Sequence, residues 1–291
     1  METDVGLAPG LWLVATPIGS MDDLSPRACD VLRRARVILA EDTRRTGRLL
    51  ASFGIAASGR LTSFHEHNEQ ERTATVLLRL QQGESVAIVS DAGTPVLSDP
   101  GFELVRRARM DGLPIFSVPG PSSFAAALAA SGQPPLPAVL AGFLPPRRGP
   151  RKLKLAELTR IEWTVVILLS PHRLKDELED LAEAFGPDRP ATLLAELSKR
   201  YERGVLASLG ELATCEETHN PRGEYILVAG PRAAPARTID PDVVDAVYRQ
   251  AVRRGLKRAD ALRWTSEKLG IKRRDVFDAL RDAGSRPSHG S

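Results

Sequence analysis

The sequence has little cysteine, few aromatic residues and no long hydrophobic run. Its two cysteines, Cys29 and Cys215, lie far apart and lack the paired spacing of a zinc site or a disulfide framework. An aliphatic run such as Val165 to Leu169 is far shorter than the ~20 residues that span a bilayer. The N-terminus, residues 1–10, lacks the basic start and apolar core of a signal peptide. We therefore expect a cytoplasmic protein with no disulfide, no metal and no membrane contact.

Neither sign of charge dominates the whole chain, but its C-terminal end is basic. The 40 Lys and Arg residues against 37 Asp and Glu give a net charge of +3, whereas Arg249 to Arg281 contains eleven basic and four acidic residues. This concentration favours nucleic-acid contact over a solvated helical bundle, which is the alternative interpretation. Lys272, Arg273 and Arg274 open a predicted helix, where cations are disfavoured unless a partner phosphate offsets them.

Short apolar runs alternate with segments of helical periodicity, which is typical of parallel βαβ construction. In the first part of the chain, strands are predicted at 11–16, 37–40, 86–90 and 114–118. Helices are predicted at 25–35, 69–82 and 101–111. Because these strands are continuously hydrophobic rather than alternating, we expect an open α/β sheet with helices on both faces.

A second group of elements follows a predicted helix at 121–131. Its strands are predicted at 138–143, 164–169, 191–195, 204–208 and 225–229, with a helix at 173–185. The Pro-rich basic segment 145–154 is interpreted as a loop, either solvated or in contact with phosphate. We expect domains at 1–120 and 121–232, a linker at 233–237, a helix-turn-helix-like appendage at 238–284 and disorder at 285–291.

Small and polar residues form three loops that follow strands, at 16–19, 90–95 and 118–123. Ligands bind at the carboxyl ends of strands in open α/β sheets, so these loops are candidates for a binding site. Gly and Pro are also turn residues, and one such loop alone would favour a plain turn. The motifs G-x-G-x-x-G and G-x-x-x-x-G-K-[ST] are absent, which argues against the usual dinucleotide and triphosphate sites.

These loops occur with further motifs in the order seen in the ribosomal RNA small-subunit cytidine-2′-O-methyltransferase family of the tetrapyrrole methylase superfamily. The further motifs are at 40–44, 64–69, 98–101, 141–145, 171–173 and 223–224. The chain resembles this family over about residues 10 to 230. It departs from the family at Leu168-Leu169, where members commonly have Tyr-Glu, and at 195–199, where Ala-Glu-Leu-Ser-Lys replaces Arg-Glu-Leu-Thr-Lys.

The resemblance implies a two-domain tetrapyrrole-methylase-like α/β fold, with an open, mainly parallel sheet in the N-terminal domain and a mixed sheet in the second. It also implies a homodimer that binds S-adenosylmethionine between its domains. The implied substrate is a decoding-site cytidine of 16S rRNA within the small ribosomal subunit. With their loop neighbours, the implied cofactor contacts are Pro17, Ile18, Gly19, Asp91, Ala92, Gly93, Thr94, Val96, Gly120, Ser122, Ser123, Leu169 and Leu197.

The string His-Glu-His-Asn-Glu at 65–69 is the strongest candidate for the chemistry. A ribose hydroxyl is a poor nucleophile, so a positioned base would accelerate its methylation. The candidate bases are His65, Glu66, His67 and Glu69, then Glu41 and Asp42, with Lys199 to stabilise the developing alkoxide. The alternative is a polar loop in which Asn68 caps the next helix and Glu71 completes a capping box, and we expect Asn68 to cap in either case.

Two other functions remain open on the residues alone. A methylase of tetrapyrroles would share fold and cofactor, but its cofactor loop would resemble Gly-Gly-Asp-Pro and the basic tail would be unexplained. A non-catalytic ribosome-assembly binder would keep the fold without the reaction. If the substrate is RNA, the predicted RNA contacts are Arg44, Arg147, Arg148, Lys152, Lys272, Arg273 and Arg274.

Overall fold

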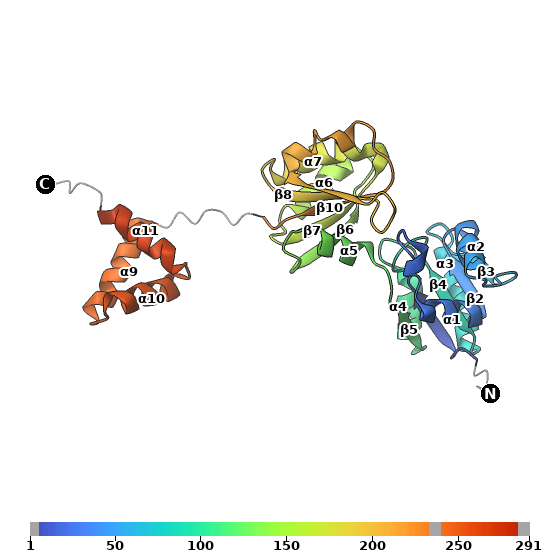
Figure 1. Ribbon diagram of the computed structural model, residues 1–291. Coiled ribbons are helices and arrows are strands. Elements are labelled where there is room, and N and C mark those ends of the chain that lie inside the picture. Colours follow the sequence, from blue (N-terminus) through green and yellow to red (C-terminus); the bar gives the residue numbers. More distant parts are fainter. Residues whose placement is uncertain (1–5, 233–239, 285–291) are drawn as a thin grey trace. The chain divides into compact units, whose positions relative to one another are not determined.

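The computed structural model describes residues 6–232 and 240–284, which form a larger α/β unit and a small helical unit (Figure 1). The larger unit ends at Arg232 and contains two five-stranded sheets. The predicted linker at 233–237 and the predicted disorder at 285–291 lie outside the described residues. In the part of the chain that is described, no helix is long and apolar enough to cross a membrane.

The first sheet is entirely parallel and has the strand order β3-β2-β4-β1-β5. Its strands are β1 (Gly10–Val14), β2 (Val37–Ala40), β3 (Leu61–Ser63), β4 (Ser85–Val89) and β5 (Ile115–Val118). Since all five run the same way, the loops that follow them all emerge at one edge of the sheet. This edge is where the candidate site is expected.

Helices cover both faces of this sheet, which confirms the open α/β arrangement. On one face, α1 (Pro26–Arg34) and α2 (Thr43–Ser52) pack against Val14 and Ala87 of the strands. On the other face, α3 (Glu69–Gln81) and α4 (Phe102–Met110) pack against Leu11 and Ile88. A short 3-10 helix, η1 (Met21–Asp23), follows the first loop. The elements β3 and α2 were not predicted.

The second sheet is mixed, as expected, and has the order β6-β7-β10-β8-β9. Its strands are β6 (Ala138–Phe143), β7 (Thr164–Leu169), β8 (Pro190–Ala195), β9 (Arg203–Ser208) and β10 (Tyr225–Ala229). Only β6 and β7 pair in parallel. One face is covered by α5 (Ser123–Ala130), and the other by α6 (Arg148–Leu158), α7 (Leu174–Phe185) and α8 (Leu209–Leu212) (Figure 1). Two 3-10 turns, η2 (Pro171–Arg173) and η3 (Glu216–Thr218), complete this half.

The segment 145–154 is a loop only as far as Arg147, so its interpretation as a loop throughout is wrong. Helix α6 begins at Arg148, and Pro150 lies in its first turn. A proline is tolerated there because the first N–H groups of a helix have no partner within the helix. Leu155 and Leu158 then pack into the core of the second sheet and hold the helix in place.

The small unit is a bundle of α9 (Pro241–Arg253), α10 (Arg258–Leu269) and α11 (Arg273–Gly284). Its core contains Val244, Leu262 and Val276. Gly270 adopts the left-handed conformation, with φ of 62°, and lets the chain turn sharply between α10 and α11. The predicted order of helix, turn and helix is therefore present.

Candidate active site

The three loops singled out in the sequence meet at the carboxyl edge of the first sheet. Thr16 and Gly93 exchange backbone hydrogen bonds of 2.9 and 3.0 Å, which join the loops after β1 and β4. The Thr94 hydroxyl donates to the carbonyl of Pro121 at 3.2 Å, which joins the loop after β4 to the start of α5. Gly120 approaches Ala15 so closely that a Cβ would lie 3.0 Å from the alanine methyl group. The loops thus form one connected surface.

The second sheet contributes the loop after β8 to the same surface. A Cβ on Gly19 would lie 2.6 Å from the Leu197 carbonyl oxygen and 2.7 Å from Lys199, so only glycine fits there. The Ser20 N–H donates to the Ser198 hydroxyl at 3.2 Å. Ile18 and Leu197 pack in one apolar cluster. The predicted cofactor residues from both halves of the larger unit are therefore brought together.

Leu169 is an exception among the predicted cofactor contacts. Its side chain is only 2% exposed and packs in the core between the second sheet and helices α6 and α7. Leu168, its neighbour on β7, lies in the opposite cluster with Ile18 and Leu197, because successive residues of a strand face opposite sides. The Leu169 side chain is therefore placed away from the loops, and Leu168 is the residue of β7 that faces them.

Carboxylates gather where β2 and β4 end. Asp91 accepts the Asp42 N–H at 3.2 Å and forms an ion pair with Arg45 at 3.0 Å. Burial, together with the negative charge of Asp91, raises the pKa of the neighbouring Glu41 above its usual 4.5. The site is therefore acidic, and one arginine partly compensates its charge.

Asp99 belongs to this acidic group, although its sequence pattern did not single it out as a functional residue. Burial, together with the negative charges of Glu41 and Asp91, raises its pKa from 3.8 to about 7. Val96 and Ser98, just before it, have positive φ angles of 76° and 69°. A β-branched residue in this conformation is strained, and such strain is typical of functional loops. No pattern of residue types in the sequence reveals burial of this kind.

The histidine-containing loop is held by Asn68, which does not act as the expected cap. Asn68 occupies the N-cap position of α3, but its side chain makes no capping hydrogen bond. Its Oδ1 instead accepts the His65 N–H at 2.8 Å, and its Nδ2 lies 3.2 Å from His65 Nε2. An amide N–H that donates to Nε2 leaves the proton of a neutral imidazole on Nδ1, which is buried and has no hydrogen-bond partner among the described residues. The predicted capping box is therefore absent, and Asn68 fixes the His65 ring.

The other members of the loop differ in their surroundings. Glu66 and His67 are exposed. The Glu69 carboxylate accepts the N–H groups of Gly101 and Glu103 at 3.0 and 3.3 Å. It therefore caps α4 from outside that helix, which gives Glu69 a structural role at the edge of the site.

Lys199 lies between two carboxylates beside the first loop. Its Nζ is 2.9 Å from Glu196 and 3.2 Å from Glu224. Burial alone would lower the pKa of Lys199, but the hydrogen bond to Glu196 and the charge of Glu224 raise it above 10.5. Lys199 therefore stays protonated, which suits the predicted stabilisation of an oxyanion and does not suit a base.

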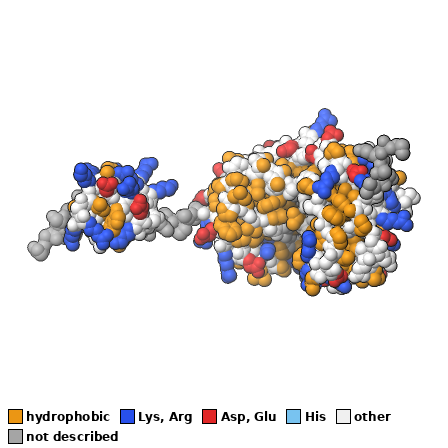
Figure 2. Space-filling view, turned by 90° about the horizontal axis from the view of Figure 1, so that it is seen from below, with side chains coloured by type: hydrophobic (Ala, Val, Ile, Leu, Met, Phe, Trp, Pro, Cys, Tyr) orange, Lys and Arg blue, Asp and Glu red, His pale blue; other side chains and the backbone are white. Residues whose placement is uncertain are grey.

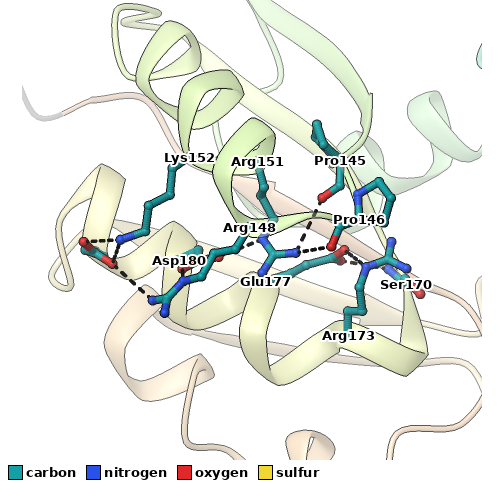
Figure 3. A network of polar contacts seen from close by, with 10 residues as sticks. Pro145, Pro146, Arg148, Arg151, Lys152, Ser170, Arg173, Glu177 and Asp180 are labelled. Atoms are coloured by element: carbon teal, nitrogen blue, oxygen red, sulfur yellow. Dashed lines mark hydrogen bonds and ion pairs between the residues drawn. The ribbon is translucent and has the colours of Figure 1, made fainter.

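The predicted RNA contacts fall into two classes. Figure 3 shows Arg148 and Arg151 on either side of Asp180, at 3.0 and 2.7 Å, and Lys152 is 2.8 Å from Glu183. Although burial raises the pKa of Asp180, its hydrogen bonds with Arg151 and Arg148 lower it below 3.8. These cations join α6 to α7 and are already paired. The other predicted contacts, Arg44, Arg147, Lys272, Arg273 and Arg274, are exposed and do not take part in this network, although Arg44 lies 3.7 Å from Asp42 and Arg274 lies 3.8 Å from Asp278.

Comparison with known proteins gives consistent results. The family model of the tetrapyrrole (corrin/porphyrin) methylases matches residues 10–213. A crystal structure of uroporphyrin-III C-methyltransferase from Thermus thermophilus, in complex with S-adenosyl homocysteine, superposes with a TM-score of 0.52 at 24% identity, covering 76% of this chain and 97% of the other. The chain therefore has the tetrapyrrole-methylase fold, as expected.

Sequence relatives narrow the class further. Ribosomal RNA small subunit methyltransferase I of Pseudomonas aeruginosa is 44% identical over 223 residues, which cover 76% of this chain and 78% of the relative. The protein of the same name from Escherichia coli O157:H7 is 39% identical over 269 residues, covering 92% and 93%. The chain belongs to the tetrapyrrole methylase family, in the group of the ribosomal RNA small subunit methyltransferase I proteins.

Proposed function

We propose that the chain methylates the ribose 2′-hydroxyl of a decoding-site cytidine in 16S rRNA. S-adenosylmethionine is the methyl donor. The observation that carries the proposal is the meeting of the three loops at one sheet edge, where β3 also delivers the His65 to Glu69 segment. The names of the curated relatives support an rRNA substrate. This substrate makes the cytoplasm the proposed location.

The residues that line the connected loops fit this cofactor. Ser122 caps α5 and leaves backbone N–H groups at the start of that helix, where a ligand carboxylate is favoured. Asp91 offers a carboxylate to a cationic group, and Ile18 and Leu197 offer apolar surface to an adenosine. Ala92 is exposed and small, so its backbone can be approached closely. These residues would hold the cofactor, although their contacts with it are part of the proposal.

The chain's own part in the reaction is alignment, proton acceptance and charge stabilisation. Bound S-adenosylmethionine supplies a methyl group made electrophilic by its sulfonium. Alignment of the ribose oxygen with that methyl group lowers the barrier by up to about 7–11 kcal/mol. The C–O bond would form as the methyl–sulfur bond breaks and S-adenosylhomocysteine leaves, and the hydroxyl proton would pass to a base, for which we propose Glu66, His67 or Asp99. The Lys199 cation stabilises negative charge on the oxygen.

The decisive test measures transfer of labelled methyl groups into purified small ribosomal subunits, followed by mass spectrometry of the modified nucleoside. The expected product is a 2′-O-methylcytidine. A methyl group on a base would contradict the proposed ribose chemistry. Transfer to a tetrapyrrole instead would identify a tetrapyrrole methylase, and tight subunit binding without transfer would identify an assembly factor.

A homodimer is part of the proposal. Hydrophobic side chains gather on the face of the larger unit that Figure 2 shows. Exposed apolar side chains in this unit include Leu136 at 80%, Phe143 at 60% and Leu206 at 66% exposure. Exposed apolar surface of this kind is typical of protein contacts. Light scattering of the purified chain is expected to give twice the mass of a monomer.

A further inference from the structure

A groove with a volume of about 720 Å³ opens beside the candidate site. One wall is the segment after β8, which includes Tyr201, and the other is the segment before β10, which includes Asn220 and Arg222. Its volume lies within the range of ligand sites, roughly 300–1,000 Å³. No function described above uses this groove.

At the base of the groove, the charged side chains are paired with each other. Arg203 donates two hydrogen bonds of 2.6 Å to the two oxygens of Glu217, and the Tyr225 hydroxyl donates to the same carboxylate at 2.9 Å. Hydrogen bonding to Glu217 raises the pKa of Arg203, so the pair stays charged. Such bidentate pairs fix geometry as well as charge. The groove is therefore a preformed surface that binding need not first order.

The side chains at the rim of the groove are exposed and available to a ligand. The Tyr201 side chain is 68% exposed, and the Arg200 guanidinium lies 5.7 Å from the centre of its ring. Asn220 is exposed and offers both a donor and an acceptor. Within the described part of the chain, the guanidinium groups of Arg200 and Arg222 form no ion pair with a carboxylate. A flat aromatic ring, an amide and two free cations are the groups that recognise an unpaired nucleotide.

The groove is connected to the candidate site through Glu196. This residue lines the groove, and its Oε1 accepts both Lys199 Nζ and the Glu224 N–H at 2.9 Å. Gly223 lies against the same carboxylate, which leaves no room for a Cβ. Lys199 in turn packs on Gly19 of the first loop. A strand that places its ribose at Lys199 therefore has its neighbouring nucleotide beside the groove.

We propose that this groove binds one unpaired nucleobase of the RNA strand that carries the methylated ribose. The base stacks on Tyr201 and is hydrogen-bonded by Asn220, while its flanking phosphates lie near Arg200 and Arg222. The inference rests on the proposed function, and it adds a specificity site to the reaction. Stacking on one exposed ring beside the candidate site would allow a chain with only 5% aromatic residues to bind a single strand.

The test compares single-turnover methylation of small subunits by the full-length protein and by Tyr201→Ala, Tyr201→Phe and Asn220→Ala. Stacking on one ring predicts that Tyr201→Ala raises the half-saturating subunit concentration about five- to 150-fold, while Tyr201→Phe stays within about threefold. Asn220→Ala is expected to raise it about threefold or more. Affinity for S-adenosylmethionine, measured by calorimetry, is expected to be unchanged in all three.

Trp163→Ala is the matched control. Trp163 is 52% exposed and precedes β7, whereas the groove lies where the other end of this strand, Leu169, pairs with Tyr225. The control is expected to methylate like the wild type. A Tyr201→Ala protein within twofold of the wild type, or an equal loss in Tyr201→Phe, overturns base stacking in the groove. A wild-type protein that methylates no subunit overturns the proposed function itself, so the two failures are distinct.

Discussion

Two aspartates near the carboxyl edge of the first sheet have opposite electrostatic surroundings. Asp42 caps α2, and the backbone N–H groups of Arg44 and Arg45 lower its pKa below 3.8. Asp99 is partly buried and lies near the negative charges of Glu41 and Asp91, so its pKa rises to about 7. The same side chain is thus stabilised as an anion at one position and penalised as an anion at the other.

We predict that Asp99→Asn stabilises the free protein at about pH 8. Because the folded-state pKa of Asp99 is raised, the folded state binds more protons than the unfolded state between about pH 4 and 7, and stability falls as the pH rises through that window. Asparagine is neutral throughout and avoids this loss. Thermal unfolding should show a higher Tm for the variant at pH 8 and a smaller difference at pH 5. An equal difference at both pH values would contradict the assignment.

Asp42→Asn serves as the comparison with opposite sign. The folded-state pKa of Asp42 is lowered, so its stabilisation is present above the unfolded pKa and is lost as the pH falls through the folded value. The variant should be less stable than the wild type at pH 8, by a small amount because asparagine also caps helices. Stabilisation by both substitutions at pH 8 would show that removal of any negative charge suffices.

Glu66 gives the sharpest test of the chemistry, because it is exposed and makes none of the structural bonds that hold Glu69. Glu66→Ala is expected to lower the single-turnover methylation rate by about 10²–10⁴-fold if it is the base, with partial recovery at high pH. Cofactor affinity should not change. Glu71→Ala, an exposed carboxylate on the first turn of α3, is the control. Rates within twofold of the wild type for Glu66→Ala would transfer the role to His67 or Asp99.

Ala92 is a cleaner probe of cofactor binding than Gly93. Gly93 has a φ of 85°, and a Cβ there would lie 3.3 Å from Ile18, so any side chain at this position strains the loop itself. Ala92 is exposed, and Ala92→Trp should keep the fold while it fills the space above the loop. Calorimetry is expected to show at least a tenfold loss of S-adenosylmethionine affinity. Ala74→Trp, on the exposed side of α3, should bind normally, and normal binding by Ala92→Trp would exclude this loop from the site.

At the scale of elements, Glu69 joins two helices that cover the same face of the first sheet. It belongs to the first turn of α3, yet its carboxylate satisfies the N–H groups of Gly101 and Glu103 at the start of α4. The N-cap residue of α4 is Gly101, which has no side chain to do this. The strained loop before α4 therefore ends at a residue fixed from a different helix.

We expect Glu69→Ala to lower the free energy of unfolding by about 1–2 kcal/mol, because two partly buried N–H groups lose their acceptor. Urea unfolding measures this loss, and Glu69→Gln should recover part of it. A Glu71→Ala protein, whose carboxylate is exposed and lies two residues further along α3, should unfold like the wild type. No change in Glu69→Ala would mean that water replaces the carboxylate without cost.

Continuous hydrophobic runs were sufficient to predict most strands, since β2 and β7 begin and end at the predicted residues, 37–40 and 164–169. The edge strand β3 was missed because three half-buried residues carry no periodicity. The start of helix α6 was missed because Pro150 indicated a loop, although a proline is tolerated in the first turn of a helix. The loops of the site were predicted from their small residues. Asp99 and the inward face of Leu169 were not, because burial depends on which elements pack together.

At the scale of the whole molecule, the most basic segment of the chain belongs to a different unit from the tetrapyrrole-methylase fold. The family model ends at residue 213, and the three-helix unit at 240–284 lies beyond it. In Figure 2, Lys and Arg side chains are spread over the surface of this unit. Arg254 and Lys268 both lie over the Trp264 ring, at 5.1 and 4.5 Å from its centre. Cations held in this way remain available to phosphate.

Removal of everything after Arg232 is expected to leave S-adenosylmethionine affinity unchanged and to weaken binding to small subunits. The salt dependence should also fall, because each lost phosphate contact lowers the slope of log K against log salt by about 0.7–0.9. Full-length protein with Lys272→Gln and Arg273→Gln should show an intermediate slope. Equal slopes for the full-length and truncated proteins would show that the basic unit does not contact the subunit.

The position of β4 between β1 and β2 also determines when the chain can fold. Among the described strands, β1 pairs with β4 and β5, so its first partner exists only once the ribosome has made residues 85–89. Until then the growing polypeptide exposes an apolar strand with both edges free, which is the form most prone to misassociation. The loops after β1 and β4 are joined in the same event. A nascent chain that ends before residue 85 therefore has neither the pairing of β1 with β4 nor the contact between the loops that follow these two strands.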